Sequence, residues 1–230
     1  MQLVNQSVEV MTKIPKDLLQ QIELAGRVCY KSEAKITAKS AEKFVANLIM
    51  RGHESVLEHW AATFRVICDR GITHELVRHR IGAYSQESTR YCNYGNTGVK
   101  IINAFPRDLG VNGRKIQNVF QKSVSRAAAD YRELLSLGVA PQMARSVLPT
   151  ALKTEIIISY NLRQLRHFFR LRAAPSAHPQ MQEIAGALLY YFRKTQPALF
   201  SDVGQLSHMT HLAQLTTPQG SVFLWDPKKE

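Results

Sequence analysis

Two short segments of the chain concentrate cationic and hydrogen-bonding side chains. In the first, Arg-His-Arg at residues 78–80 is followed by Ser-Thr-Arg-Tyr at residues 88–91; in the second, Asn-Leu-Arg at residues 161–163 is followed by Arg172. An arginine guanidinium offers planar, bidentate donors and keeps its charge when it is desolvated. This density of arginines and hydroxyls predicts an anion site of a kind that suits phosphate.

The geometry of a helix limits how the first segment can act. Consecutive helical residues diverge by about 100°, so Arg78, His79 and Arg80 cannot all serve one face. We expect them either to surround one bulky ligand or to contact two ligands. Taken alone, the tripeptide is equally typical of a solvated basic turn, so other parts of the sequence have to decide.

Neither a metal site nor a serine nucleophile is predicted. A zincin helix carries two histidines four residues apart, whereas His74 and His79 are five positions apart and would point about 140° away from each other on a helix. Ser88 lacks the His and Asp of a serine hydrolase, and its neighbour Arg90 is a cation that cannot act as a base. We therefore expect Ser88 to hydrogen-bond a phosphate.

The composition is that of a folded, basic protein. Of the 230 residues 45% are apolar, and 30 Lys and Arg against 18 Asp and Glu give a formal charge of +12. This excess attracts anions at long range, and nucleic acid, nucleotides and folate polyglutamates all qualify. No stretch reaches the roughly 18 apolar residues of a membrane span, so a cytoplasmic location is expected. Cys29, Cys68 and Cys92 form no Cys-x-x-Cys pair and are expected to be reduced thiols.

Hydrophobic periodicity predicts the elements that must position these residues. Helices are expected at 16–30, 40–51, 72–80, 115–137, 162–171 and 180–192, and strands at 8–11, 60–68, 99–102 and 154–158. Residues 81–85 have the irregular composition of a loop, so residues 78–80 would end a helix and face a ligand from there. The inward face of the helix at 115–137 is expected to carry Val119, Val124, Ala127 or Ala128, Tyr131 and Leu135.

These elements predict an α+β fold, with long helices packed on a small mixed or antiparallel sheet. The strands do not alternate regularly with the helices, and neither a GxGxxG nor a GxxxxGK(S/T) sequence occurs, which disfavours Rossmann and P-loop sites. No repeat or linker divides the chain. Residues 1–230 are therefore predicted to form a single domain, in which residues 201–230 are a C-terminal tail of undefined role.

Four blocks of the sequence together resemble one family. Arg-His-Arg, seven residues, Ser and then Arg-Tyr, at 78–91, is similar to the hallmark of flavin-dependent thymidylate synthases. Residues 52–59 resemble that family's Gly-His-x-Ser-x-x-Glu-His segment, residues 142–149 its Ala-Arg-x-Val-Leu-Pro segment, and residues 161–172 its Asn-x-Arg and Leu-Arg segment. The blocks follow the family's order. The resemblance implies the family's activity, which is the methylation of dUMP to dTMP.

The resemblance also implies two sets of site residues. FAD would be bound by His53, Ser55, Arg78, His79, Arg80, Gln86, Asn161, Arg163 and His167. The substrate dUMP would be bound by Glu75, Leu76, Val77, Arg78, Gln86, Glu87, Ser88, Thr89, Arg90, Arg145 and Arg172. Arg172 is implied to be catalytic, because it would face the N3/O2 edge of uracil and favour the anionic form of the base. A permanently charged guanidinium suits that role.

The family's chemistry implies co-substrates and an assembly as well. Methylenetetrahydrofolate would donate a methylene carbon, FAD would carry the hydride that completes the methyl group, and NADPH would reduce the flavin. The protein would orient the ligands and stabilise charge without a covalent nucleophile. In this family the site is composed from more than one subunit of a homotetramer, and neither a membrane nor a stable nucleic-acid partner is expected.

Two alternatives to this enzyme remain open. A nucleic-acid-binding module would account for the basic charge and for Arg163, Arg166 and Arg170, which share a helix face. The other is a flavoprotein without catalytic activity. The chain departs from the family pattern at Glu75, Gln142, His167 and Gln180.

Overall fold

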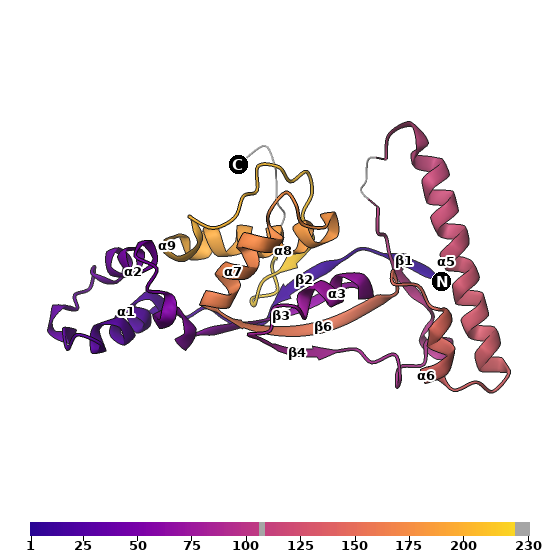
Figure 1. The fold of residues 1–230 in the computed structure, drawn as a ribbon, viewed down its shortest axis with the longest axis horizontal. Coiled ribbons are helices and arrows are strands. Elements are labelled where there is room, and N and C mark those ends of the chain that lie inside the picture. Colours follow the sequence, from indigo (N-terminus) through magenta and orange to yellow (C-terminus); the bar gives the residue numbers. More distant parts are fainter. Residues whose placement is uncertain (106–108, 224–230) are drawn as a thin grey trace. The chain divides into compact units, whose positions relative to one another are not determined.

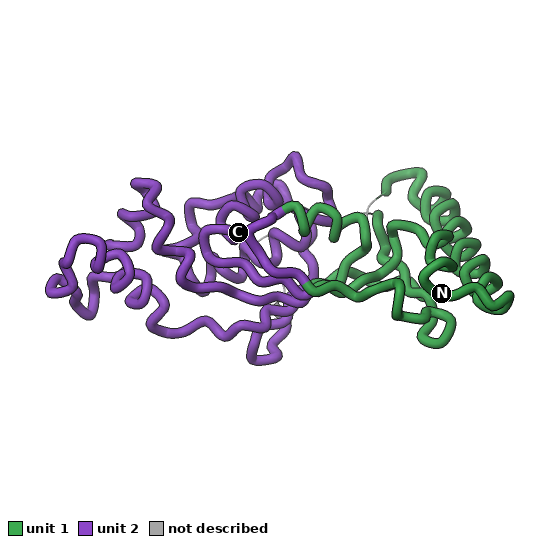
Figure 2. Tube along the Cα trace, turned by 60° about the horizontal axis from the view of Figure 1, so that its bottom comes forward, with its two compact units in different colours: residues 1–7, 66–78, 85–156 green, residues 8–65, 79–84, 157–230 purple. Residues whose placement is uncertain are grey.

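The computed structural model describes residues 1–105 and 109–223, and the chain divides into two compact units (Figure 2). Unit 1 consists of residues 1–7, 66–78 and 85–156, and unit 2 of residues 8–65, 79–84 and 157–230. Strands β3 (Ala61–Asp69) and β6 (Lys153–Asn161) each begin in one unit and end in the other. The units are therefore joined by continuous strands. That residues 1–230 form one family domain stays a prediction.

The strands form a six-stranded sheet and a separate two-stranded sheet. The larger has the order β4-β6-β3-β2-β7-β8, and the smaller pairs β1 with β5 in parallel. Along β6, exposure alternates residue by residue, with Thr154, Ile156, Ile158 and Tyr160 buried, as expected for a strand with one face on a core. The remaining strands are β1 (Gln2–Val4), β2 (Ser7–Val10), β4 (Ala83–Gln86), β5 (Lys100–Ile102), β7 (Gln214–Thr216) and β8 (Val222–Phe223).

Helices α7, α8 and α9 of unit 2 lie side by side (Figure 1) and bury a cluster of aromatic rings between them. The ring centroids of Phe192 and Phe200 are 5.0 Å apart, and those of Phe169 and Phe200 are 5.6 Å apart. Aromatic pairs at such distances add to the stabilisation that burial provides. The helices of this unit are α1 (Leu18–Val28), α2 (Ala41–Met50), α7 (Leu162–Arg172), α8 (Pro179–Thr195) and α9 (Pro197–Phe200), with 3-10 helices η1 (Glu33–Lys35) and η2 (Glu54–His59).

Unit 1 has its own core, which lies against the long helix α5 (Gly113–Ser136). Val124, Ala128 and Tyr131 of this helix pack with Ile101 and Leu152. The helix is followed by Gly138 at φ +84°, a left-handed conformation that glycine adopts without the steric cost of a Cβ atom. The other helices are α3 (Arg70–Leu76), α4 (Tyr94–Thr97) and α6 (Pro141–Ala144), with 3-10 helices η3 (Gly110–Asn112) and η4 (Arg145–Val147).

The α+β fold predicted from the sequence is confirmed, and the long helices and the main strands lie where they were expected. Three details were wrong. The helix predicted at 72–80 is α3 (Arg70–Leu76), so residues 78–80 follow the helix and do not form its end. Residues 83–86 form strand β4 where a loop was predicted, and Val119 on α5 is 63% exposed. In the described ranges, no helix is long and apolar enough to cross a membrane. The cytoplasmic location stays a prediction, and residues 224–230 of the expected tail lie outside the described residues.

Candidate functional site

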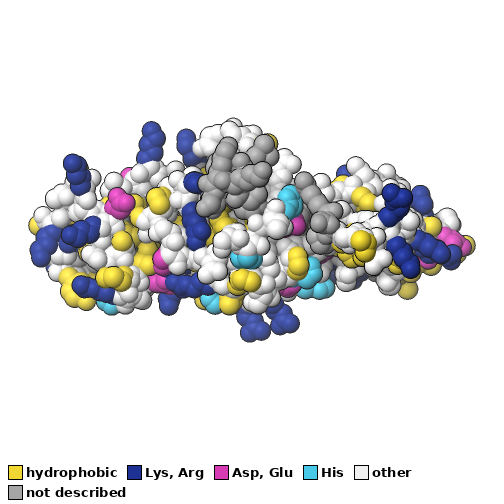
Figure 3. Space-filling view, turned by 90° about the horizontal axis from the view of Figure 1, so that it is seen from above, with side chains coloured by type: hydrophobic (Ala, Val, Ile, Leu, Met, Phe, Trp, Pro, Cys, Tyr) yellow, Lys and Arg dark blue, Asp and Glu magenta, His cyan; other side chains and the backbone are white. Residues whose placement is uncertain are grey.

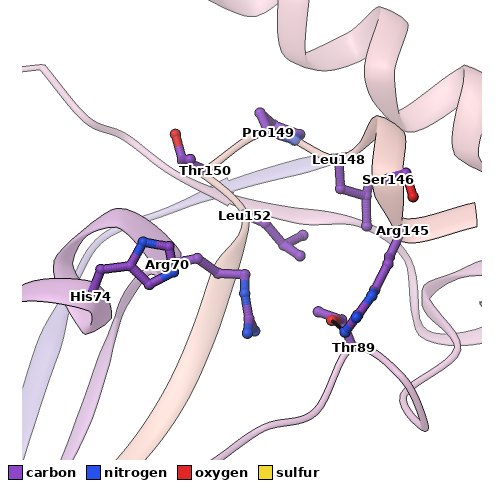
Figure 4. Close-up of a pocket in the computed structure, with 9 residues that line it drawn as sticks. All are labelled: Arg70, His74, Thr89, Arg145, Ser146, Leu148, Pro149, Thr150 and Leu152. Atoms are coloured by element: carbon purple, nitrogen blue, oxygen red, sulfur yellow. Dashed lines mark hydrogen bonds between the residues drawn. The ribbon is translucent and has the colours of Figure 1, made fainter. Parts of the chain in front are cut away.

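Unit 1 contains a cavity of about 330 Å³ that combines two arginines with hydroxyl groups (Figure 4). In Figure 4, Arg70 and Arg145 extend from separate elements toward the same side of this cavity. Among the described residues, no carboxylate lines it. Two guanidinium groups without a lining carboxylate make it suited to an anion. The lining consists of Arg70, His74, Thr89, Arg145, Ser146, Leu148, Pro149, Thr150 and Leu152.

Arg145 begins η4 and is oriented by a buried hydroxyl. Its Nη1 donates to Oγ1 of Thr89 at 2.8 Å, and Thr89 is only 4% exposed. Both residues were predicted to bind dUMP, and the structure brings them together in the cavity. The contact fixes one edge of the guanidinium without neutralising its charge, so Arg145 remains a cation available to a ligand.

Arg70 is the first residue of α3 and is also held by uncharged groups. Its Nη1 donates to the Glu87 carbonyl oxygen at 3.3 Å and to the Thr154 hydroxyl at 3.4 Å. The start of the helix is fixed because Oδ1 of Asp69 accepts from the Ile72 amide at 2.8 Å. In the described part of the chain, neither Arg70 nor Arg145 forms a salt bridge.

The side chains of Gln86 and Glu87 have partners within unit 1. Gln86 Nε2 donates to the hydroxyls of Thr73 and Thr154 at 3.0 and 3.2 Å. Glu87 accepts from Lys153 Nζ and from the Tyr94 hydroxyl, each at 2.9 Å. Burial, together with Glu87, raises the pKa of Tyr94. These bonds hold the segment that leads into Ser88, and binding of FAD or dUMP by the two side chains stays a prediction.

The remaining predicted dUMP residues of unit 1 lie at the end of α3 and after Ser88. The Ser88 Oγ accepts from the Arg90 amide at 3.3 Å, and the exposed Arg90 guanidinium lies over the Tyr91 ring, 5.4 Å from its centroid. Leu76 is fully buried, backbone included, so it presents no exposed atom to a ligand. Glu75, Val77 and Arg78 complete the set, and none of them lines the cavity as described.

In unit 2, His79 joins the two segments that the sequence singled out. The Arg172 Nε donates to Nε2 of His79 at 3.0 Å, and the Gln164 side-chain amide lies 3.0 Å from Nδ1. His79 is 4% exposed. Its backbone carbonyl accepts a short hydrogen bond from the Tyr84 hydroxyl. The middle residue of the Arg-His-Arg segment is therefore buried, whereas Arg78 and Arg80 are exposed.

The surroundings of His79 disfavour its charged form. Burial, the Arg172 guanidinium and His167 lower the pKa of His79 to about 4. The ring centroid lies 5.2 Å from that of Phe168 and 5.8 Å from that of His167. At neutral pH the imidazole is therefore uncharged, and it accepts the hydrogen bond of a neighbouring cation.

The other residues predicted to bind FAD in unit 2 present mostly exposed donors. His53, Ser55, Arg80 and His167 are exposed. Arg163 donates to Oε1 of Glu58 at 2.6 Å, with its side chain 53% exposed, and so links α7 to η2. Asn161 differs, because its Oδ1 accepts from the Gln164 amide at 2.8 Å and caps α7. Binding of FAD by these residues stays a prediction.

The arginine face of α7 does not form an open basic surface. Arg166 is fully buried and donates to both carboxylate oxygens of Asp202, at 2.8 and 2.7 Å. Its Nε also donates to Glu54 Oε1 at 3.2 Å, and Arg170 reaches the same oxygen at 3.0 Å. With Arg163 paired to Glu58, each arginine of this face has a carboxylate partner. The regular spacing of Arg163, Arg166 and Arg170, which suggested a nucleic-acid surface, is therefore explained by ion pairs within the protein.

The charge of +12 is dispersed on the face seen in Figure 3. Lys and Arg side chains protrude there at several separate places, with uncharged atoms between them. Within the described ranges, no three His, Cys, Asp or Glu side chains lie close enough to hold a metal ion.

Sequence reasoning missed Arg70 and His74 as cavity residues. Arg70 directly follows strand β3, where Asp69 caps the next helix. A residue at the start of a helix that follows a strand can direct its side chain back over the end of that strand. An Asp-Arg pair directly after a predicted strand was therefore the signal that could have identified Arg70. His74 was considered only as a metal ligand. It lies far from Arg145 in the sequence, so nothing in the sequence indicated that the two residues line the same cavity.

Comparisons with known proteins identify the same family as the four sequence blocks at residues 52–59, 78–91, 142–149 and 161–172. A family model described as thymidylate synthase complementing protein matches residues 10–198. A flavin-dependent thymidylate synthase of Geobacter sulfurreducens is 35% identical over 190 residues, covering 80% of this chain and 81% of the relative. One of Pyrococcus furiosus is 35% identical over 178 residues, covering 74% and 72%.

A solved structure has the same fold. It is a UMP/dUMP methylase, PolB, from Streptomyces cacaoi, bound with 5-Br dUMP. The TM-score is 0.73 at 24% sequence identity, over 87% of this chain and 96% of that chain. A family model that spans most of the chain and relatives of 35% identity lead to one conclusion: the chain is an enzyme of the flavin-dependent thymidylate synthase family.

Proposed function

We propose that the protein methylates dUMP to dTMP, with methylenetetrahydrofolate as carbon donor, FAD as hydride carrier and NADPH as reductant. The observation that carries this proposal is the cavity of unit 1, which Arg70 and Arg145 line and in which none of the described lining residues is a carboxylate. The relatives are named as thymidylate synthases, and PolB, with the same fold, was solved with a brominated dUMP. A nucleoside monophosphate such as dUMP has both the anionic phosphate that the cavity suits and the pyrimidine on which these enzymes act.

The phosphate of dUMP is assigned to this cavity. The volume of the cavity, about 330 Å³, lies within the range of about 300–1,000 Å³ that is usual for ligand pockets. Arg70 and Arg145 supply charge-assisted hydrogen bonds to a phosphate dianion, and Thr89 keeps Arg145 in place. His74 lines the same cavity and adds a ring nitrogen at its edge.

The pyrimidine is assigned to Arg172 of unit 2. This side chain is partly buried, and a guanidinium that faces N3 and O2 of uracil favours the anionic base, whose C5 is the better nucleophile. We propose a homotetramer in which subunits contribute jointly to each site. The phosphate cavity and Arg172 that serve one dUMP then need not belong to the same chain.

The residues present fit a flavin dinucleotide. The Arg80 guanidinium and the Ser55 hydroxyl are accessible donors of the kind that a pyrophosphate accepts, and His53 and His167 offer exposed rings. The Arg163 side chain is 53% exposed beside its pair with Glu58, so FAD would compete with that carboxylate for the guanidinium. When bound, FAD would supply the hydride that completes the methyl group. The chain's own part is to bind and orient the ligands and to stabilise the negative charge on uracil.

The direct test is turnover by the purified protein. Flavin-loaded enzyme given dUMP, methylenetetrahydrofolate and NADPH should form dTMP, detected by chromatography, and omission of any one component should abolish the product. Arg172→Ala should lose methyl transfer while its flavin is still reduced by NADPH. Absence of flavin from the purified protein, or of dTMP from the complete mixture, would refute the proposal.

A further inference from the structure

Both ring nitrogens of His79 face side chains that can donate hydrogen bonds. The Arg172 Nε lies 3.0 Å from Nε2, and the amide of Gln164 lies 3.0 Å from Nδ1. A neutral imidazole has one donor nitrogen and one acceptor nitrogen. The two contacts therefore cannot both be made to acceptor nitrogens, and the chemistry of the partners decides which nitrogen carries the proton.

Arg172 determines the tautomer, because its Nε–H can only donate. The Nε2 of His79 must then be the acceptor, so the proton lies on Nδ1. Gln164 has both an amide nitrogen and an amide oxygen, and these are assigned from the hydrogen-bond network. A half-turn of its amide places the oxygen where it accepts from Nδ1–H. Gln164 is 6% exposed, so this bond is also needed to satisfy its buried amide.

We propose that His79 is a positioning residue of the methylation reaction: a neutral Nδ1–H imidazole whose Nε2 accepts from Arg172 Nε and thereby aims the guanidinium at the pyrimidine. The proposal rests on the function proposed above, in which Arg172 faces uracil. An accepted bond at Nε fixes the plane of the guanidinium. That plane decides where the Nη donors point, so His79 acts on the substrate through Arg172.

The packing around His79 holds its ring in one orientation. The ring lies edge to face with Phe168, 5.2 Å between centroids, and is tilted against Tyr160 at 6.1 Å. The Tyr84 hydroxyl donates to the His79 carbonyl oxygen. Because it has a single proton, its 3.1 Å contact with the Tyr160 hydroxyl is a bond that it accepts. A Cβ atom at Gly82 would come within 2.7 Å of the Tyr160 ring. A larger residue at position 82 would clash with the Tyr160 ring, so glycine is needed for the loop after His79 to pack closely against that ring.

A cationic His79 is incompatible with this arrangement. Protonation of Nε2 would remove the acceptor of Arg172 and place a buried imidazolium against a partly buried guanidinium, with His167 as a third titratable group beside them. Among the described residues, Tyr84 and Tyr160 also lie near the ring, and the pKa of each is raised, chiefly by burial. These groups remain uncharged at neutral pH and give no compensating negative charge.

The tautomer can be measured without any substrate. In protein labelled with nitrogen-15 at histidine, long-range proton–nitrogen correlation distinguishes the two neutral tautomers and the cation. His79 is assigned by comparing the wild type with His79→Gln. We expect a neutral Nδ1–H ring at pH 7. Observation of the Nε2–H tautomer, or of an imidazolium at that pH, would overturn the proposal whatever the enzyme's activity.

The positioning role is tested by a double-mutant cycle on dUMP binding, measured by calorimetry on flavin-loaded protein. His79→Phe keeps an apolar ring but removes the acceptor, and should weaken dUMP binding on the order of tenfold, the value of one lost hydrogen bond. In an Arg172→Ala background the same change should have less than about a twofold effect. Equal weakening in both backgrounds would show a packing role and contradict positioning.

His79→Gln provides the matched rescue, because its side-chain oxygen reaches about as far as Nε2 and can accept from Arg172. It should weaken dUMP binding clearly less than His79→Phe when the two variants are compared at equal flavin content, measured by absorbance. Equal loss in the two variants would also contradict the proposal, and if His79→Phe does not fold, the tautomer measurement on the wild type still decides. Failure of the wild type to bind dUMP would refute the proposed function instead, and the tautomer measurement would still decide the hydrogen-bond assignment.

Discussion

Units 1 and 2 both contain clustered arginines, but they use them differently. In unit 1, Arg70 and Arg145 are held by carbonyl and hydroxyl oxygens and line a cavity. In unit 2, Arg166 and Arg170 of α7 share the carboxylate of Glu54. An arginine with uncharged partners keeps its charge for a ligand, whereas one with a carboxylate partner is part of the structure.

The difference shows that cation spacing alone does not predict an anion site. The i, i+3, i+7 pattern on α7 has the regularity expected of a binding face, yet Arg166 is 0% exposed and its charge is balanced inside the protein. The bonds from Arg166 hold the pKa of Asp202 below its ordinary value. Arg70 and Arg145 are far apart in the sequence, and they share a cavity only because the fold brings α3 and η4 together.

The largest effect should come from removing the buried arginine. Arg166→Ala removes a fully buried side chain and its bonds to Glu54 and Asp202. Because Glu54 keeps Arg170 and the Asp202 side chain is 51% exposed, the cost should be about 3 kcal/mol, the low end for breaking a buried ion pair. We expect the free energy of unfolding in urea to fall by that amount. The matched control is Arg126→Ala, whose exposed pair with Asp130 should contribute less than about 0.5 kcal/mol. Similar losses in both variants would remove the distinction between the units.

A pH-dependent stability should come from His79. The pKa of His79 is about 4 in the folded protein and about 6.5 in an unfolded chain. Between these values the unfolded state binds more protons, so stability is complete above about pH 6.5 and falls as the pH is lowered toward 4. The loss is at most about 3 kcal/mol. His79→Gln should flatten this part of the profile measured by urea unfolding, and an unchanged slope would show that another group is responsible.

The sequence predicted the parts of the fold that have strong local signals. Helices α5, α7 and α8 were found because their apolar residues repeat with helical spacing. Val119 was predicted to face inward because it shares the helical spacing of the buried residues of α5. That spacing does not show how far along the helix the core extends, and Val119 is exposed. Residues 81–85 resembled a loop because strand β4 is short and only half-buried, so it lacks a clear alternation.

For a similar reason, the sequence indicated only some of the residues that line the cavity. Thr89 and Arg145 belong to matched blocks and do meet in the cavity, but Arg70 and His74 lie outside the blocks and are brought there by tertiary contacts. The bond between His79 and Arg172 likewise joins residues 93 positions apart in the chain. Neither contact leaves a local pattern that one sequence could reveal.

The smallest effect should come from a cysteine. None of the described residues that line the cavity is a cysteine, and burial raises the pKa of the Cys68 thiol, which disfavours a thiolate. Cys92, close to Arg90 in the sequence, is the remaining candidate for a nucleophile in this unit. Cys92→Ala should keep the rate of dTMP formation within about twofold of the wild type. Loss of turnover in a folded, flavin-loaded variant would show that the cations of unit 1 activate a thiolate.

The central claim is that the arginines of unit 1 bind the phosphate of dUMP. Calorimetry with dUMP and with deoxyuridine, which lacks the phosphate, tests it directly. Arg70→Ala and Arg145→Ala should each weaken dUMP binding by about 2 kcal/mol, roughly thirtyfold, and leave deoxyuridine binding unchanged, while Arg126→Ala affects neither ligand. If both cavity variants bind dUMP as tightly as the wild type, or lose affinity equally for both ligands, the cavity is not the phosphate site.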